Sequence, residues 1–215
     1  MMNKRNYQRE LDGILESREE GEKVPRLLLH SCCAPCSSYV LEYLSKFFEI
    51  TVYFYNPNIF PEAEFLKRLR EEEMLVDRME FVHPVRVIGG AWESEEFYRA
   101  ARGYEDAPEG GERCFRCYGL RLREAAKVAK AGGYDFFMTT LTISPLKNAD
   151  KLNEIGEKVG KEFGVRWLPS DFKKRDGYKR SIELSREYGL YRQDYCGCVY
   201  SLNRENCVKE EGGLT

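Results

Sequence analysis

The sequence predicts an α/β fold with a parallel sheet of about four to five strands, helices on both faces, and a helical C-terminal portion. Short apolar runs alternate along the 215-residue chain with longer amphipathic segments. Such alternation is typical of βαβ units, in which each helix crosses the sheet between two parallel strands. A chain of this length suits one substantial core. We therefore expect a HUP/Rossmann-like architecture.

Five segments have the composition of strands. The first, 26–30 (RLLLH), is a short apolar run, and the second, 49–55 (EITVYFY), is rich in β-branched and aromatic residues. The other three are expected at 81–88, 134–144 and 164–169. Pro84 weakens the prediction for 81–88, because proline cannot donate a ladder hydrogen bond.

Amphipathic spacing predicts helices between these strands. The segment from Pro35 to about Phe47 follows the first strand, and Pro35 suits a first helical turn because that position needs no N–H. A helix from about Phe115 to Lys130 stops before a Gly-Gly pair. The remaining helices are expected at 6–20, 61–79, 93–103, 148–163 and 177–189, with a short last helix after them.

The chain is expected to be a single catalytic domain, 1–215, with an N-terminal helix in 1–25 and the helical C-terminal portion in 171–215. No apolar stretch approaches the ~20 residues of a spanning helix, so we predict a soluble, cytoplasmic protein without a membrane partner. A net charge of -2 argues against a generic nucleic-acid coat. Lys and Arg are nevertheless concentrated in 113–132 and 173–180, either as solvated faces or as a local basic surface.

Three of the eight cysteines, Cys32, Cys33 and Cys36, lie within five positions directly after the first strand. Ligands of parallel sheets bind beyond the carboxyl ends of the strands, so this segment is expected at the functional site. Because neighbouring side chains on one backbone point in different directions, we expect Cys32 and Cys33 to reach partners elsewhere and not each other.

Two further cysteine pairs have informative spacing. Cys114 and Cys117 form a C-x-x-C at the start of an Arg-rich helix, where the helix dipole and free N–H groups favour thiolates. Cys196 and Cys198 flank Gly197, and a disulfide closing so small a ring is expected to be strained and readily reduced. Two more metal ligands are the alternative for this pair. Cys207 is expected to be a bystander.

Three kinds of site fit these cysteines. They are a structural Zn²⁺ with four thiolates, a thioredoxin-like dithiol at Cys33 and Cys36, and an iron–sulfur cluster with four ligands from two chain segments. The spacing of the cysteines does not decide among these three kinds of site. A cluster passes one electron at a time and a dithiol carries two, so the combination of a cluster with Cys196 and Cys198 indicates a reductase for a two-electron reduction.

Five long motifs stand in a fixed order along the chain: LLHSCCAPCSS (28–38), FYNPNIFP (54–61), ERCFRCYGLRL (112–122), TTLTISPLKN (139–148) and DGYKRSIELSREYGLYRQDYCGC (176–198). Together they resemble the QueH family of epoxyqueuosine reductases. The resemblance implies an enzyme that removes the epoxide oxygen of epoxyqueuosine at the wobble position of tRNA, leaving queuosine. It implies no need for cobalamin. The expected partners are the tRNA and an unidentified electron donor, ferredoxin-like or a chemical equivalent.

The resemblance also implies roles for the cysteines. Cys32, Cys33, Cys114 and Cys117 correspond to the [4Fe–4S] ligands, and Cys196 and Cys198 to a redox-active disulfide. Cys36 either exchanges roles with Cys32 or Cys33 or helps to bind an additional iron ion. Phe60 stands where the family has His, which puts a polar contact near that turn in doubt.

The substrate contacts are expected among basic, aromatic and polar side chains of the same motifs. Contacts to tRNA phosphates are expected from Lys173, Lys174, Arg175, Lys179 and Arg180. Residues available for stacking on the splayed base are Tyr55, Phe115, Tyr118 and Tyr195. Candidate proton donors are Asp194, Tyr195 and Tyr200, each of which also suits a structural role. The alternatives to a reductase are a zinc-bound, tRNA-binding module without redox chemistry and a thioredoxin-like thiol oxidoreductase.

Overall fold

Five parallel strands form the central sheet of the computed structural model, which describes residues 5–17 and 21–202. Their order across the sheet is β3-β2-β1-β4-β5, as in Rossmann-like folds. The strands are β1 (Arg26–His30), β2 (Glu49–Phe54), β3 (Val85–Gly89), β4 (Phe136–Thr139) and β5 (Arg166–Trp167). The predicted α/β class with a parallel sheet is confirmed.

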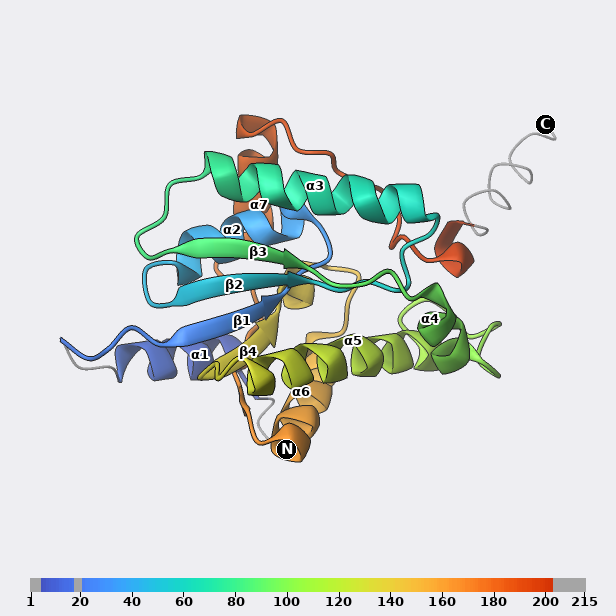
Figure 1. The fold of residues 1–215 in the computed structure, drawn as a ribbon, viewed down its shortest axis with the longest axis horizontal. Helices are drawn as coiled ribbons and strands as arrows, with labels where there is room; N and C mark the ends of the chain where they lie inside the picture. Colours follow the sequence, from blue (N-terminus) through green and yellow to red (C-terminus); the bar gives the residue numbers. More distant parts are fainter. Residues whose placement is uncertain (1–4, 18–20, 203–215) are drawn as a thin grey trace.

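Helices cover both faces of the sheet, as expected. Helices α2 (Ala34–Leu44), α3 (Glu62–Arg78) and α7 (Gly177–Glu187) lie on one face, and α5 (Glu112–Ala131) and α6 (Ala149–Phe163) lie on the other (Figure 1). The remaining two helices are α1 (Tyr7–Glu16) and α4 (Ser94–Ala101). A last helical turn begins at Val199, whereas Cys207 lies outside the described residues. None of the described helices is long and apolar enough to span a membrane.

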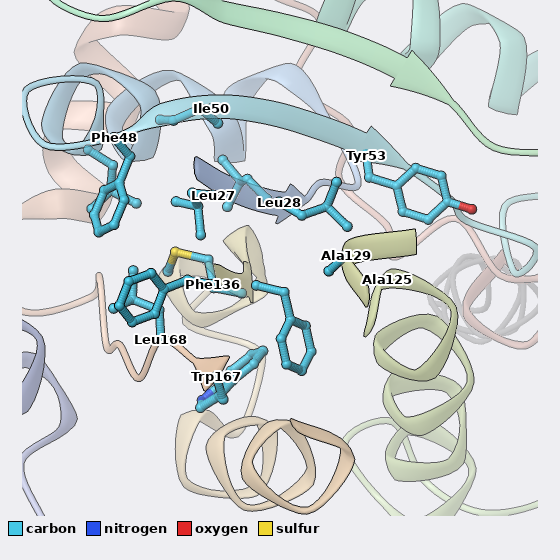
Figure 2. Packing of buried hydrophobic residues seen from close by; sticks show 14 of the residues in the cluster. Leu27, Leu28, Phe48, Ile50, Tyr53, Ala125, Ala129, Phe136, Trp167 and Leu168 are labelled. Carbon is cyan, nitrogen blue, oxygen red and sulfur yellow. The ribbon is translucent and has the colours of Figure 1, made fainter. Parts of the chain in front are cut away.

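The core is built around β1, the middle strand of the sheet. Leu27, Leu28 and Leu29 have no exposed surface, since helices cover both faces of the strand. Figure 2 shows Leu27 and Leu28 between Ile50 of β2 and Phe136 of β4. Burial of each leucine side chain contributes roughly 1.5–3 kcal/mol, which fixes the strand whose end carries the first cysteines.

Three predicted strands are too long. Strand β3 begins at Val85, directly after Pro84, which lacks the N–H that a ladder requires. Strand β4 ends at Thr139, because the Thr139 hydroxyl accepts a hydrogen bond from Leu141 N (3.2 Å) and starts a 3-10 helix, η1 (Thr140–Ile143). Only two residues of the segment 164–169 pair with β4.

The strand order creates a topological switch point between β1 and β4. The chain passes from β1 to β2 and β3 on one side, and then returns to place β4 on the other side of β1. Crevices at such points bind ligands at the carboxyl ends of the strands. The segment after β1 carries Cys32, and the segment after β4 leads through η1 to Lys147.

Candidate functional site

Cys32, Cys33 and Cys36 form a tight group of thiols where β1 turns into α2. Their three sulfur atoms lie within 4.8 Å of one another, and Cys32 Sγ is 3.8 Å from Cys33 Sγ. The expectation that the adjacent pair would not meet is therefore wrong. Cys33 is the N-cap residue of α2, so the two cysteines lie where the chain turns from β1 into the helix. Hydrogen bonds from Cys33 and Cys36 hold the pKa of Cys32 well below its usual range.

The buried carboxyl group of Glu72 stabilises this loop. Ser31 and Ser37, which bracket the three cysteines, have hydroxyl oxygens 2.6 Å apart, and Ser31 Oγ donates to Glu72 Oε2 of α3 at 2.9 Å. All three side chains are fully buried. Burial raises the pKa of Glu72 to about 7, and the hydrogen bonds from Ser37 and Ser31 oppose that rise.

Cys114 and Cys117 lie in the first two turns of α5, because this helix begins at Glu112, earlier than predicted. The Gly110 N–H donates to Cys114 Sγ at 3.3 Å. Cys117 is buried, and this burial raises the pKa of its thiol to about 11, partly opposed by the nearby Arg121.

The C-G-C segment packs against the turn before α3. Phe60 N donates to Gly197 O at 2.9 Å, so the residue that departs from the family pattern contacts this segment through its backbone. Gly197 has φ 100°, and a Cβ there would lie 3.1 Å from both Arg68 Nη1 and Ile59 Cγ1. Cys196 and Cys198 are free thiols. A hydrogen bond from Cys198 holds the pKa of Cys196 well below its usual range.

Two adjoining cavities bring the cysteine groups together. The smaller is lined by Cys114, Cys117, Cys196 and Cys198. The larger, of about 240 Å³, is lined by Cys32, Cys33, Cys36 and Cys196. Cys196 and Lys147 border both cavities. The structure therefore gathers all seven described cysteines around one region, with Cys196 at the junction.

Three cations surround the thiols, and sequence reasoning missed all of them. Arg68 of α3 and Arg121 of α5 are each 1% exposed, and Lys147 is half-buried. Burial alone would lower the pKa of Lys147, but the thiolates of Cys196 and Cys32 raise it above the ordinary value. The available signals were positional, since Arg121 follows Cys117 by one helical turn and Lys147 lies in the SPLKN motif. Arg68 is already paired with Glu64 at 2.7 Å. Buried cations are normally paired with anions, so Arg121 and Lys147 suit a neighbouring group with net negative charge.

A thiolate-bound iron–sulfur cluster or a thiolate-bound zinc ion would meet that requirement. Each has a net negative charge, because the negative charge of its four thiolates exceeds the net positive charge of the zinc ion or of the iron–sulfide core. The donor set fits either group, because cysteine thiolate is the preferred ligand of both. Cys114 and Cys117 have sulfurs on one helix end, and Cys32 and Cys33 have theirs on the neighbouring strand end.

The predicted aromatic and acidic residues divide between the cavities and the core. Asp194 and Tyr195 line the larger cavity, and Tyr118 lines the smaller. Tyr200 instead packs against Phe97 and under Arg113, whose guanidinium carbon is 4.6 Å from the ring centre. Tyr55 stacks on Tyr53 and lines neither cavity. Phe115 packs against Tyr118.

Much of the predicted basic segment is paired with carboxylates. Arg175 contacts Asp12 at 2.6 Å, Arg180 contacts Glu42 at 2.6 Å, and Lys173 contacts Asp171 at 3.0 Å. Lys174 and Lys179 are exposed, and within the described ranges neither forms an ion pair. Fewer positive charges are therefore available to an outside partner than the number of Lys and Arg residues in this segment suggests.

Comparison with known proteins gives a consistent family. A family model described as "Epoxyqueuosine reductase QueH" matches residues 27–204. The chain is 43% identical over 204 residues to an "Epoxyqueuosine reductase QueH" of Staphylococcus epidermidis, covering 93% of this chain and 86% of that protein. A protein of the same name from Streptococcus pyogenes is 43% identical over 91% of this chain and 78% of its own length. One from Thermotoga maritima is 38% identical over 82% of this chain and 90% of its own. The chain therefore belongs to the QueH family of epoxyqueuosine reductases.

Proposed function

We propose that this protein reduces epoxyqueuosine at the wobble position of tRNA to queuosine, with a [4Fe–4S] cluster and a redox-active cysteine pair. Membership of the QueH family supports the reaction. The observation that carries the proposal is the position of Cys196, which borders one cavity with Cys114 and Cys117 and the other with Cys32 and Cys33. A dithiol here lies beside both groups of candidate cluster ligands.

The proposed cluster ligands are Cys32, Cys33, Cys114 and Cys117. When bound, the cluster supplies single electrons to the site. The role of Cys36 is to help hold an additional iron ion. The sulfur atoms of Cys32, Cys33 and Cys36 lie within 4.8 Å of one another, which supports a metal ion held with the help of Cys36 beside the cluster.

The reaction balances with the thiols of the C-G-C pair. Both C–O bonds of the epoxide break, a C=C bond forms, and the oxygen leaves as water, which requires two electrons and two protons. Oxidation of Cys196 and Cys198 to a disulfide supplies both electrons. With Cys196 as the thiolate, the Cys198 thiol supplies one proton and Asp194 or Tyr195 the other. The strain of so small a ring favours its return to the dithiol, with electrons from a one-electron donor, ferredoxin-like or a chemical equivalent. Asp194 and Tyr195 in the larger cavity are the proposed proton donors.

The larger cavity is the proposed place of the modified base. Enzymes that act on one base take it out of its stack into a pocket, and loop bases of RNA are read in splayed form. A cavity of about 240 Å³ lies directly over the cysteine loop. Tyr195 borders it and is available for stacking. The tRNA backbone supplies most of the affinity through Lys and Arg.

Anaerobic purification with metal and sulfide analysis tests the proposal, together with an assay on epoxyqueuosine-bearing tRNA. The wild type is expected to be brown, with iron and sulfide in comparable amounts. Cys114→Ala is expected to lose both the colour and all turnover. Cys196→Ser is expected to keep the colour and reduce turnover to the level without enzyme.

Two results would contradict it. A colourless wild-type protein with one tightly bound Zn²⁺ and no turnover would favour a zinc-bound, tRNA-binding module. Full turnover by Cys196→Ser would refute the role of the C-G-C pair while leaving the cluster in place.

A further inference from the structure

Arg121 is a buried cation that touches the end of one candidate ligand pair. It lies on α5 one helical turn after Cys117, and 1% of its surface is exposed. Its guanidinium makes three contacts. Nη2 donates to Asn56 Oδ1 at 2.6 Å, Nε donates to His30 Nε2 at 3.3 Å, and Nη1 lies 4.0 Å from Cys117 Sγ.

No carboxylate in the described part of the chain pairs with Arg121. Asn56 is neutral, and the imidazole of His30 carries no negative charge in either protonation state. A guanidinium does not lose its proton in a folded protein, and a buried charge without a counter-charge is unfavourable. The groups near Arg121 that can carry negative charge are therefore the cysteines of the site, with Cys117 in contact and Cys32 and Cys196 close enough to act on its charge.

The same guanidinium joins the two candidate ligand pairs. Asn56, which accepts from Arg121, donates through Nδ2 to Ser31 O at 2.8 Å, and Ser31 directly precedes Cys32. His30, the residue before Ser31, is held from its other side by Thr139 Oγ1 at 2.8 Å. Arg121 thus connects Cys117 on α5 with the end of β1 that carries Cys32 and Cys33.

We propose that Arg121 is a positioning residue for the cluster. Arg121 aligns the two ligand pairs and raises the reduction potential of the cluster. The inference rests on the proposed cluster at Cys32, Cys33, Cys114 and Cys117. Reduction adds one electron and makes the cluster one charge more negative. A fixed cation nearby stabilises the reduced form more than the oxidised form, so loss of the cation lowers the midpoint potential.

The test is an anaerobic redox titration of the full-length protein, monitored by electron paramagnetic resonance. Arg121→Met keeps much of the side-chain length and removes the charge. Its midpoint potential is expected to shift to more negative values by several times the spread between repeat titrations, with a changed spectrum of the reduced state. Arg121→Lys is expected to recover most of the potential. Arg123→Met is the matched control, because Arg123 is exposed on the same helix and pairs with Glu162 of α6.

A second pair of variants covers the case in which Arg121→Met does not fold. Asn56→Asp and Asn56→Leu both remove the hydrogen bond to Ser31 O, but only Asn56→Asp places a negative charge against the guanidinium. Asn56→Asp is expected to have the lower midpoint potential of the two. Equal potentials in this pair, or an unchanged potential in Arg121→Met, would overturn the inference.

The wild-type protein separates this failure from failure of the proposed function. If the wild type has iron, sulfide and turnover but the midpoint potential does not change when Arg121 is replaced, only the role of Arg121 is overturned. A wild type without iron and sulfide overturns the proposed cofactor and this inference with it.

Discussion

Glu72 shows at the level of one residue how a buried group shapes the cysteine loop. Its carboxyl group has no exposed surface and accepts a hydrogen bond from Ser31, while Ser31 and Ser37 contact each other. The two serines bracket Cys32, Cys33 and Cys36 in the sequence. Glu72 of α3 therefore holds both ends of the loop that presents the three thiols.

The raised pKa of Glu72 predicts a pH-dependent stability. The folded pKa of about 7 exceeds the ordinary 4.5, so the folded state binds the proton more tightly than the unfolded state. Stability from this group is fully present below pH 4.5 and is lost as the pH rises from 4.5 to about 7, by about 3 kcal/mol at most. Glu72→Gln is expected to remove this loss.

Urea unfolding of the reduced, metal-free protein at pH 5 and pH 7.5 measures the effect. The thiols also titrate, so the informative quantity is the difference between wild type and Glu72→Gln at each pH. Parallel dependence of the two proteins on pH would show that Glu72 is not the responsible group.

At the level of elements, Asn153 compensates for the shortness of β5. From α6, its Nδ2 donates to Ala149 O at 2.8 Å and to Ser170 O at 2.9 Å. Its Oδ1 accepts from Trp167 Nε1 at 3.0 Å and from Ser170 N at 3.1 Å. A two-residue strand provides few ladder bonds, so this fully buried amide fixes Trp167 in the strand and Ser170 just after it.

Replacing Asn153 by Leu is expected to lower the free energy of unfolding by about 3 kcal/mol. The Trp167 and Ser170 N–H groups would remain buried without acceptors, at roughly 1–3 kcal/mol each. Denaturant unfolding measures the loss. Asn148→Ala is the control, since it removes only the N-cap bond to Lys151 N and is expected to cost ~1 kcal/mol. Equal losses in the two variants would contradict the role given to Asn153.

For the whole molecule, the distribution of charge limits how tRNA can bind. The net charge is -2, and Arg175 and Arg180 of the basic segment already contact Asp12 and Glu42. An ion pair within the protein must be broken or shared before its cation neutralises a phosphate. Lys174 and Lys179, exposed and without ion pairs in the described part of the chain, are the better candidates for phosphate contacts.

Lys174→Ala with Lys179→Ala is therefore expected to weaken tRNA binding and to reduce the slope of log affinity against log salt by up to about 2, or about 1 for each phosphate that a lysine no longer neutralises. Arg180→Ala is expected to change the slope less. Titration of labelled tRNA at several salt concentrations measures both. A larger change from Arg180→Ala than from the two lysines would refute this assignment.

The order of strands and helices followed from the sequence because its signals are local. Apolar runs such as 26–30 and helical spacing such as 61–79 lie within a few turns of chain, and the structure confirms an element at each. The error at β4 came from a local side-chain bond that ends the strand early. Thr139 ends β4 with a hydroxyl contact to Leu141 N, although TTLTIS has the composition of a strand.

The sequence by itself determined the fold class, the cysteine groups and the family. Cysteine spacing and motif order can be read from the sequence without any knowledge of tertiary contacts. Only the tertiary structure decided that Cys32 and Cys33 meet, that Cys196 borders both cavities, and that Arg121 stands between the ligand pairs. The physical reason is the strand order: His30, Asn56 and Arg121 lie far apart in the chain, and they meet because β1 lies between β2 and β4 with α5 packed across it.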